Sequence, residues 1–361
     1  MAHMDVAGIR KVFELARSLK NPVNLSIGQP DFEVPLPVRN AAKEAMENRK
    51  NGYTLTQGIP ELRETILADV RKWYPHNNDR GLVITSGTSG ALTIALCCTV
   101  NPGDEVIIFD PFFVMYPHFV RLAGGTPVFL STYPTCTIDV DRVRSAISPR
   151  TKAILVNSPA NPTGVLHSRE SLRDLALLAQ ERRILLISDE VYRAFAYDAP
   201  FVSPAEFNPD VLVVDGFSKS HAMTGWRLGF AHGPQRLIEE MAKLQQFTFV
   251  CAPSIVQHAG VAAWQFDPKG FANDYRRKRD LMLAGMRDRF EIVRPGGAFY
   301  LYPRVPWGTG TEFVAKAVEQ NLLILPGCSF SQQDTHFRIS YAADDLTLER
   351  GIEILNKLAR R

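Results

Sequence analysis

The chain has 361 residues, of which 45% are hydrophobic and 22% are charged, and its formal net charge is +3. This length predicts two domains, and the ordinary composition excludes a disordered or fibrous protein. The nearly balanced charge excludes a strongly basic nucleic-acid-binding surface, and no apolar run reaches the roughly 18 residues that a membrane span needs.

The cysteines bear on metal binding and on the cellular compartment. There are five of them, and no two have the CxxC spacing of a zinc site. An odd count without that spacing argues against both a disulfide framework and a zinc cluster. We therefore expect a cytoplasmic protein with no bound metal, no nucleic-acid partner and no membrane partner.

The N-terminal stretch predicts one amphipathic helix followed by extended chain. The apolar residues Val12, Leu15, Ala16 and Leu19 share one helical face, and residues 25–28 have an extended pattern. Because this stretch is too short to fold alone, we expect it to join the C-terminal part of the chain.

Residues 80–232 alternate short apolar runs with helical patterns, of which 91–99 and 170–180 are examples. This alternation is typical of a mainly parallel sheet covered by helices. Seven runs read as buried strands. They are residues 82–85, 105–109, 126–130, 153–157, 184–188, 211–214 and 228–231.

Beyond residue 260 the pattern changes to a long charged helix and two later strands, at 296–301 and 337–340. The basic cluster 276–279 lies in that helix, and we interpret it as a solvated helix face rather than a nucleic-acid patch. The pattern predicts a smaller α+β unit. We expect a large domain at 39–260 and a small domain built from 1–38 and 261–361.

A glycine-containing turn joins the first predicted strand to the next helix. Gly87, Thr88 and Ser89 stand at the start of that helix. Backbone N–H groups and a partial positive charge at a helix N-terminus form an anion site, so we expect these residues to hold a phosphate. A dinucleotide site is the competing interpretation, but the GxGxxG spacing is not matched.

The strand 184–188 runs directly into Asp189, and Tyr192 follows three residues later. A carboxylate at a strand tip in a water-poor site can pair with a protonated pyridine nitrogen and keep that ring charged. A helix N-cap is the alternative role for Asp189.

Lys219 lies among small residues just after the strand 211–214. An amine in such a partly desolvated position loses its charge more easily and becomes nucleophilic, as a Schiff-base lysine requires. A surface lysine is the alternative. Nearby along the sheet, the two prolines of segment 157–164 predict a rigid extended turn that can hold the side chain of Asn161 over a ligand.

Together these segments resemble the pyridoxal-phosphate attachment signature of class I and II aminotransferases, and the resemblance covers nearly the whole chain. It implies an α/β fold of fold type I, with a mainly parallel seven-stranded sheet and a smaller α+β domain. It implies pyridoxal 5'-phosphate as the cofactor, joined to Lys219 as a Schiff base. The other implied cofactor ligands are Asp189 on the ring nitrogen, Tyr192 and Asn161 on the ring oxygen O3′, Phe113 stacked on the ring, and Arg227 on the phosphate.

The resemblance also assigns substrate-binding residues. Arg338 matches the arginine that binds the substrate α-carboxylate, Asn161 matches an asparagine that also contacts this carboxylate, and the backbone of Gly28 lies near the same group. Tyr53 matches the tyrosine that reaches the phosphate of the neighbouring subunit, so the site requires a homodimer. From the residues alone, a strand arginine such as Arg338 is most often a surface ion-pair partner, and Phe113 fits a core residue as well as a stacking one.

Two positions depart from the family pattern. Gly216 stands where the family commonly has a phosphate-binding serine, and we expect Ser218 to compensate. Ala160 stands where many relatives have Asn or His, which affects support of the turn rather than catalysis.

The expected activity is transfer of an amino group from an L-amino acid, aspartate or aromatic, to a 2-oxo acid such as 2-oxoglutarate by a ping-pong mechanism. A pyridoxal-phosphate-dependent C–S β-lyase on the same fold is the alternative, because cofactor ligands do not dictate which bond breaks. A third alternative is a non-catalytic cofactor-binding regulatory module. Such a protein would normally carry a separate basic segment that binds nucleic acid, and the sequence has none.

Overall fold

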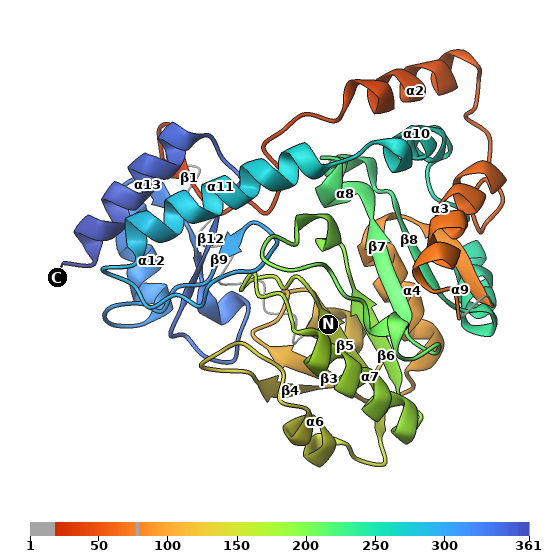
Figure 1. The fold of residues 1–361 in the computed structure, drawn as a ribbon, viewed down its shortest axis with the longest axis horizontal. Helices are drawn as coiled ribbons and strands as arrows, with labels where there is room; N and C mark the ends of the chain where they lie inside the picture. Colours follow the sequence, from red (N-terminus) through yellow and green to blue (C-terminus); the bar gives the residue numbers. More distant parts are fainter. Residues whose placement is uncertain (1–18, 77–78, 361) are drawn as a thin grey trace.

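The computed structural model describes residues 19–76 and 79–360. The helix predicted around Val12 lies outside the described residues. Figure 1 shows a large unit around one sheet, and a smaller unit in which β1 (Val23–Asn24) lies beside α13 (Asp345–Leu358). Among the residues that the structure describes, no helix has both the length and the apolar character needed to cross a membrane.

The large unit contains a seven-stranded sheet with the order β2-β8-β7-β6-β5-β3-β4. The strands are β2 (Arg80–Thr85), β3 (Glu105–Asp110), β4 (Thr126–Ser131), β5 (Thr151–Asn157), β6 (Leu185–Asp189), β7 (Leu212–Gly216) and β8 (Gly229–Pro234). Each strand predicted in this region is present. All neighbours are parallel except β8, which runs antiparallel to both β2 and β7. The predicted mainly parallel sheet is confirmed.

Helices cover both faces of this sheet because its strands are apolar on both faces. Along β3, Ile107 packs into one hydrophobic core and Ile108 into the other, as the alternation of strand side chains requires. One face is covered by α4 (Gly87–Thr99), α5 (Tyr116–Leu122) and α9 (Gln235–Thr248). The opposite face carries α3 (Pro60–Trp73), α6 (Val140–Ala146), α7 (Arg169–Arg182) and α10 (Ser254–Gln265), with α2 (Leu36–Glu47) against α10.

The small unit joins the two ends of the chain. Strand β1 (Val23–Asn24) pairs in parallel with β10 (Leu322–Leu323), which confirms that the N-terminal stretch joins the C-terminal part. A second small sheet has the order β11-β12-β9 and is formed by β11 (Leu325–Pro326), β12 (Phe337–Ser340) and β9 (Tyr300–Leu301). The helices α11 (Lys269–Met286), α12 (Gly310–Glu319) and α13 (Asp345–Leu358) accompany these strands. The boundaries at residues 39 and 260 stay a prediction.

Short helical turns complete the connections, and several border the cleft described below. They are η1 (Arg193–Phe195), η2 (Pro204–Glu206), α8 (Phe217–Ser220), η3 (Thr224–Trp226) and η4 (Gly327–Ser329).

Two expectations in the C-terminal part need correction. The strand predicted at 296–301 is shorter, because Gly297 and Ala298 donate their backbone N–H groups to Gly164 and Phe195 of the large unit. The basic cluster of α11 is not a solvated face throughout, because Lys278 and Arg279 are buried. Both lie in ion pairs, Lys278 with Asp31 and Asp274, and Arg279 with Asp198 and Asp280.

Candidate active site

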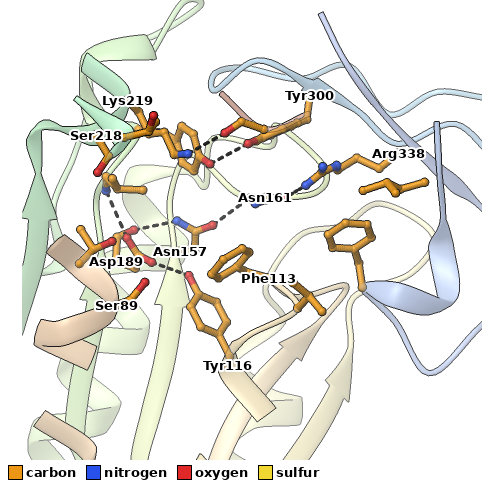
Figure 2. Close-up of a pocket in the computed structure, with 18 of the residues that line it drawn as sticks. Ser89, Phe113, Tyr116, Asn157, Asn161, Asp189, Ser218, Lys219, Tyr300 and Arg338 are labelled. Carbon is orange, nitrogen blue, oxygen red and sulfur yellow. Dashed lines mark hydrogen bonds between the residues drawn. The ribbon is translucent and has the colours of Figure 1, made fainter. Parts of the chain in front are cut away.

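A cleft of about 280 Å³ lies at the carboxyl ends of the parallel strands, between the sheet and the small unit. In open α/β sheets this edge is where ligands bind. Figure 2 shows polar side chains from both units pointing into it. Ten residues predicted for the site line the cleft: Gly28, Thr88, Ser89, Phe113, Asn161, Asp189, Tyr192, Lys219, Arg227 and Arg338.

Lys219 enters the cleft from α8, immediately after β7. Its Nζ donates a hydrogen bond to the backbone oxygen of Gly28, at 2.6 Å. Burial and the positive charges of Arg338 and Arg227 together lower the pKa of this amine to about 8, with Asp189 opposing them. An appreciable fraction of the amine is therefore neutral near physiological pH, as a nucleophile or proton carrier must be.

Asp189 ends β6 at the floor of the cleft and is 4% exposed. One carboxylate oxygen accepts a hydrogen bond from the Tyr116 hydroxyl at 2.7 Å, and the other accepts from the backbone N–H of Val191 at 3.3 Å. No helix begins at Asp189, so the alternative role as a helix N-cap does not apply. Burial raises the pKa of this carboxyl to about 6, against the hydrogen bond from Tyr116, so a cation beside it would stabilise its charged form.

Arg227 faces the start of α4. The N-cap residue Ser86 makes no side-chain capping bond, so the first N–H groups of this 13-residue helix lack a side-chain partner there. Gly87 has φ +72°, and a Cβ on it would lie 2.4 Å from a terminal nitrogen of Arg227. Glycine thus lets the guanidinium approach the helix end. The arrangement suits a phosphate group.

The departure at Gly216 has a steric reason. A Cβ at this position would lie 3.0 Å from the Cα of Gly229 and 3.3 Å from the side chain of Thr88. A serine here would crowd the neighbouring strand. Ser218 lines the cleft, and its role as a replacement stays a prediction.

Arg338 projects from β12 toward the cleft and is 5% exposed. Its guanidinium lies between the rings of Tyr300 and Phe330, 4.7 and 4.5 Å from their centroids. It donates hydrogen bonds to the Asn161 side chain at 3.1 Å and to the backbone oxygen of Ser26 at 2.7 Å. Within the described part of the chain no acid pairs with it, so it is not the surface ion-pair member considered as an alternative. A buried guanidinium without a counter-ion is suited to bind a carboxylate.

The predicted residues outside the cleft lining are Gly87 and Tyr53. Gly87 lies next to Arg227, which itself lines the cleft, whereas Tyr53 is 89% exposed. Sequence reasoning missed five polar or aromatic lining residues: Tyr116, Asn157, Thr224, Tyr300 and Phe330. Asn157 connects the turn to the floor, because it donates to the backbone oxygen of Asp189 and accepts from the backbone N–H of Asn161.

Comparison with known proteins identifies the family. The family model described as "Aminotransferase class I and II" matches residues 20–355. The chain belongs to this family.

Individual relatives align with this aminotransferase over almost their whole length. The chain is 34% identical to a probable aspartate aminotransferase of Methanocaldococcus jannaschii, across 98% of this chain and 96% of that protein. It is 37% identical to the aspartate/prephenate aminotransferase of Thermus thermophilus, across 96% and 94%. The solved structure of the aspartate aminotransferase from Thermus thermophilus with maleate superposes with a TM-score of 0.91 at 36% identity, covering 97% of this chain and 95% of that one.

The expectations of a fold type I aminotransferase and of pyridoxal phosphate as the cofactor are therefore confirmed. The residues of the cleft fit this cofactor. An amine with a lowered pKa, a buried carboxylate and an uncapped helix end beside Arg227 offer partners for its aldehyde, its ring nitrogen and its phosphate. The enzyme transfers amino groups.

Proposed function

We propose that this aminotransferase moves the amino group of an L-amino acid to a 2-oxo acid such as 2-oxoglutarate in a ping-pong sequence, with Lys219 as the proton carrier. The observation that carries the proposal is the convergence of Lys219, Asp189 and Arg338 on one cleft. Bound pyridoxal phosphate supplies an aldehyde that condenses with amines and a ring that withdraws electrons from the substrate α-carbon.

Each residue around the cofactor has a separate task in this proposal. Asp189 keeps the ring nitrogen protonated, and the side chains of Tyr192 and Asn161 hydrogen-bond the ring oxygen O3′. Phe113 stacks on the ring. The phosphate is held by Arg227 together with the start of α4, namely Gly87, Thr88 and Ser89.

The substrate is oriented from the small unit. Arg338 binds the α-carboxylate with its planar guanidinium, and the backbone of Gly28 lies beside the same group. This grip disfavours loss of the carboxylate. The Lys219 Nζ would then carry the proton that leaves the substrate α-carbon, while the bound cofactor would supply the electron-withdrawing ring.

Replacement of Lys219 by Ala tests the proposal. We expect the variant to lose the visible absorbance of the Schiff base between Lys219 and the cofactor. The rate of the half-reaction with an amino acid should fall by roughly 10²- to 10⁴-fold, the range for a positioned proton carrier. The matched control is Lys243→Ala, which removes an exposed lysine that pairs with Glu240. Borohydride reduction of the wild-type enzyme should label Lys219. Labelling of another residue contradicts the proposal, and formation of pyruvate and ammonia without an oxo-acid acceptor supports a β-lyase instead.

For the amino donor we propose aspartate or an aromatic amino acid. Support comes from the names of similar proteins, which include the aspartate/prephenate aminotransferase of Thermus thermophilus and an aromatic-amino-acid aminotransferase of Thermococcus litoralis at 33% identity. A panel of amino donors with 2-oxoglutarate as acceptor, read by the glutamate formed, tests this choice. Preference for donors outside these two classes contradicts it.

We also propose a homodimer in which Tyr53 reaches the phosphate at the neighbouring active site. This proposal is supported by the 89% exposure of Tyr53 and by the large exposed apolar side chains of Leu55 and Phe247. Exposed apolar side chains of this size are typical of protein–protein contacts. The cytoplasmic location stays a prediction.

A further inference from the structure

Tyr300 belongs to the small unit but contacts the large one. It lies on β9, is 1% exposed, and its hydroxyl is 2.9 Å from the hydroxyl of Tyr192. Figure 2 shows Tyr300 beside Lys219 and Arg338 at the cleft. The proposed function gives this residue no task so far.

The Tyr300 side chain also contacts both proposed substrate-binding residues. Its ring faces the Arg338 guanidinium, whose carbon lies 4.7 Å from the ring centroid. A Cβ on Gly28 would lie 2.6 Å from the Tyr300 hydroxyl oxygen. The Gly28 backbone oxygen in turn accepts the hydrogen bond of Lys219. Tyr300 therefore touches Tyr192, Arg338 and Gly28 at once.

The direction of the hydrogen bond between the two tyrosines follows from a count of protons. Each hydroxyl has one hydrogen to donate. If Tyr192 donates its hydrogen to the ring oxygen O3′, as proposed above, then Tyr300 must donate to the Tyr192 oxygen. Hydrogen bonds in such a chain polarise one another, so the bond from Tyr300 makes Tyr192 a stronger donor.

Building on the proposed function, we propose that Tyr300 is a positioning residue that orients the Tyr192 hydroxyl toward the cofactor and braces Arg338 for the substrate carboxylate. Its hydroxyl serves the cofactor side and its ring serves the substrate side. One residue thus joins the two halves of the site.

The variant Tyr300→Phe separates these two tasks, because it removes the hydroxyl and keeps the ring under Arg338. The measurement is the pH midpoint of the visible absorbance of the holoenzyme. We expect the midpoint to rise by roughly half a unit to one unit, because a weaker bond from Tyr192 stabilises the anionic ring oxygen less. Tyr302→Phe is the matched control: it removes a buried hydroxyl that donates to Gly327, outside the cleft, and should leave the midpoint unchanged.

Two further variants test the route of the effect. In a Tyr192→Phe background, Tyr300→Phe should add no further shift, since the residue through which it acts is gone. Gly28→Ala leaves Tyr300 in the chain but places a methyl group against its hydroxyl, and should raise the midpoint even if Tyr300→Phe does not fold. An unchanged midpoint in Tyr300→Phe or Gly28→Ala, or a full additional shift in the Tyr192→Phe background, overturns the inference. Borohydride labelling of Lys219 in each variant distinguishes this failure from failure of the proposed function, because the labelling tests the proposed function and the midpoint tests the role of Tyr300.

Discussion

The charged form of a residue in this site is stabilised by hydrogen bonds from its neighbours. Asp189 is buried, and the Tyr116 hydroxyl is the side-chain donor that stabilises its ionised form. Tyr116 was not predicted from the sequence because its partner is 73 residues away in the chain. The same holds for Tyr300, whose partner Tyr192 is 108 residues away. Lys219 and Asp189 were predicted because each directly follows an apolar strand, a signal contained in adjacent residues.

The Tyr116–Asp189 hydrogen bond predicts a loss of activity when the hydroxyl is removed. In Tyr116→Phe the pKa of Asp189 should rise further, because the ionised carboxylate loses a donor in a buried site. We expect the half-reaction with an amino acid to slow about tenfold, equivalent to ~1.4 kcal/mol. Tyr133→Phe, which removes a hydroxyl bonded to Ser331, is the control and should react normally. Equal rates for wild type and Tyr116→Phe would falsify this role.

Lys219 predicts a pH-dependent stability of the apoenzyme. In the folded protein its pKa is about 8, below the ordinary value of 10.5. Keeping the amine charged in the folded state therefore lowers the free energy of unfolding, and this loss is complete below pH 8. As the pH rises from 8 to 10.5 the folded amine is neutral while the unfolded one is still charged, and the cost disappears. We expect apo Lys219→Met to be more stable than apo wild type at pH 7 by roughly 1–3 kcal/mol. The difference, measured by urea unfolding, should shrink above pH 8, and a constant difference across this range contradicts the assignment.

At the scale of elements, the strands of the large sheet could be predicted from sequence and the small unit less well. Runs such as β3 are buried on both faces, so each is continuously apolar and bounded by turn residues. The run at 296–301 also has the pattern of a strand, but Gly297 and Ala298 donate their backbone N–H groups to Gly164 and Phe195 of the large unit. The burial of Lys278 and Arg279 on α11 could not be predicted for a similar reason. Their ion-pair partners include Asp31 and Asp198, which are distant in sequence.

The start of α4 predicts a contrast between two glycines of the same helix. Gly87→Ala places a methyl group on a residue with φ +72° and against Arg227, whereas a Cβ at Gly90 meets its nearest atom at an ordinary 3.5 Å. We expect Gly87→Ala to weaken binding of pyridoxal phosphate at least about tenfold. Gly90→Ala should bind normally, with a slightly higher melting temperature from better helix propensity. Cofactor titration of the two apoenzymes gives the comparison, and equal affinities would remove the steric argument.

Neighbouring arginines of α11 predict a second contrast. Arg279 is fully buried and bonds Asp198 and the backbone oxygen of Pro295, whereas Arg277 pairs with Asp274 and Asp345 at the surface. We expect Arg279→Met to lower the free energy of unfolding by roughly 2–4 kcal/mol, because it removes the hydrogen bonds of a fully buried guanidinium, including the one to the buried backbone oxygen of Pro295. Arg277→Met should lower it by less than ~1 kcal/mol, since exposed pairs contribute little. Chemical denaturation of both variants measures these free energies of unfolding. A larger loss in Arg277→Met than in Arg279→Met contradicts the burial argument.

At the scale of the whole molecule, the proposed dimer predicts that two inactive chains can restore each other. A Tyr53→Ala chain keeps Lys219, and a Lys219→Ala chain keeps Tyr53. If Tyr53 acts at the neighbouring site, random mixing of subunits rebuilds about a quarter of the sites in intact form. We expect activity to reappear after the two variants are co-refolded, above the sum of their separate activities. Strict additivity of the two preparations contradicts the shared site.

The short connection between β7 and β8 carries Lys219 and Arg227, the two proposed anchors of the cofactor. Because β8 runs back antiparallel beside β7, both ends of this connection are tied to the same sheet. Arg338 and Tyr300 belong instead to the β9–β12 pair of the other unit. A rigid-body displacement of that unit would therefore change the grip on the substrate while the spacing between aldehyde and phosphate anchors stays constant. The enzyme can in this way release its product and still retain its coenzyme from one turnover to the next.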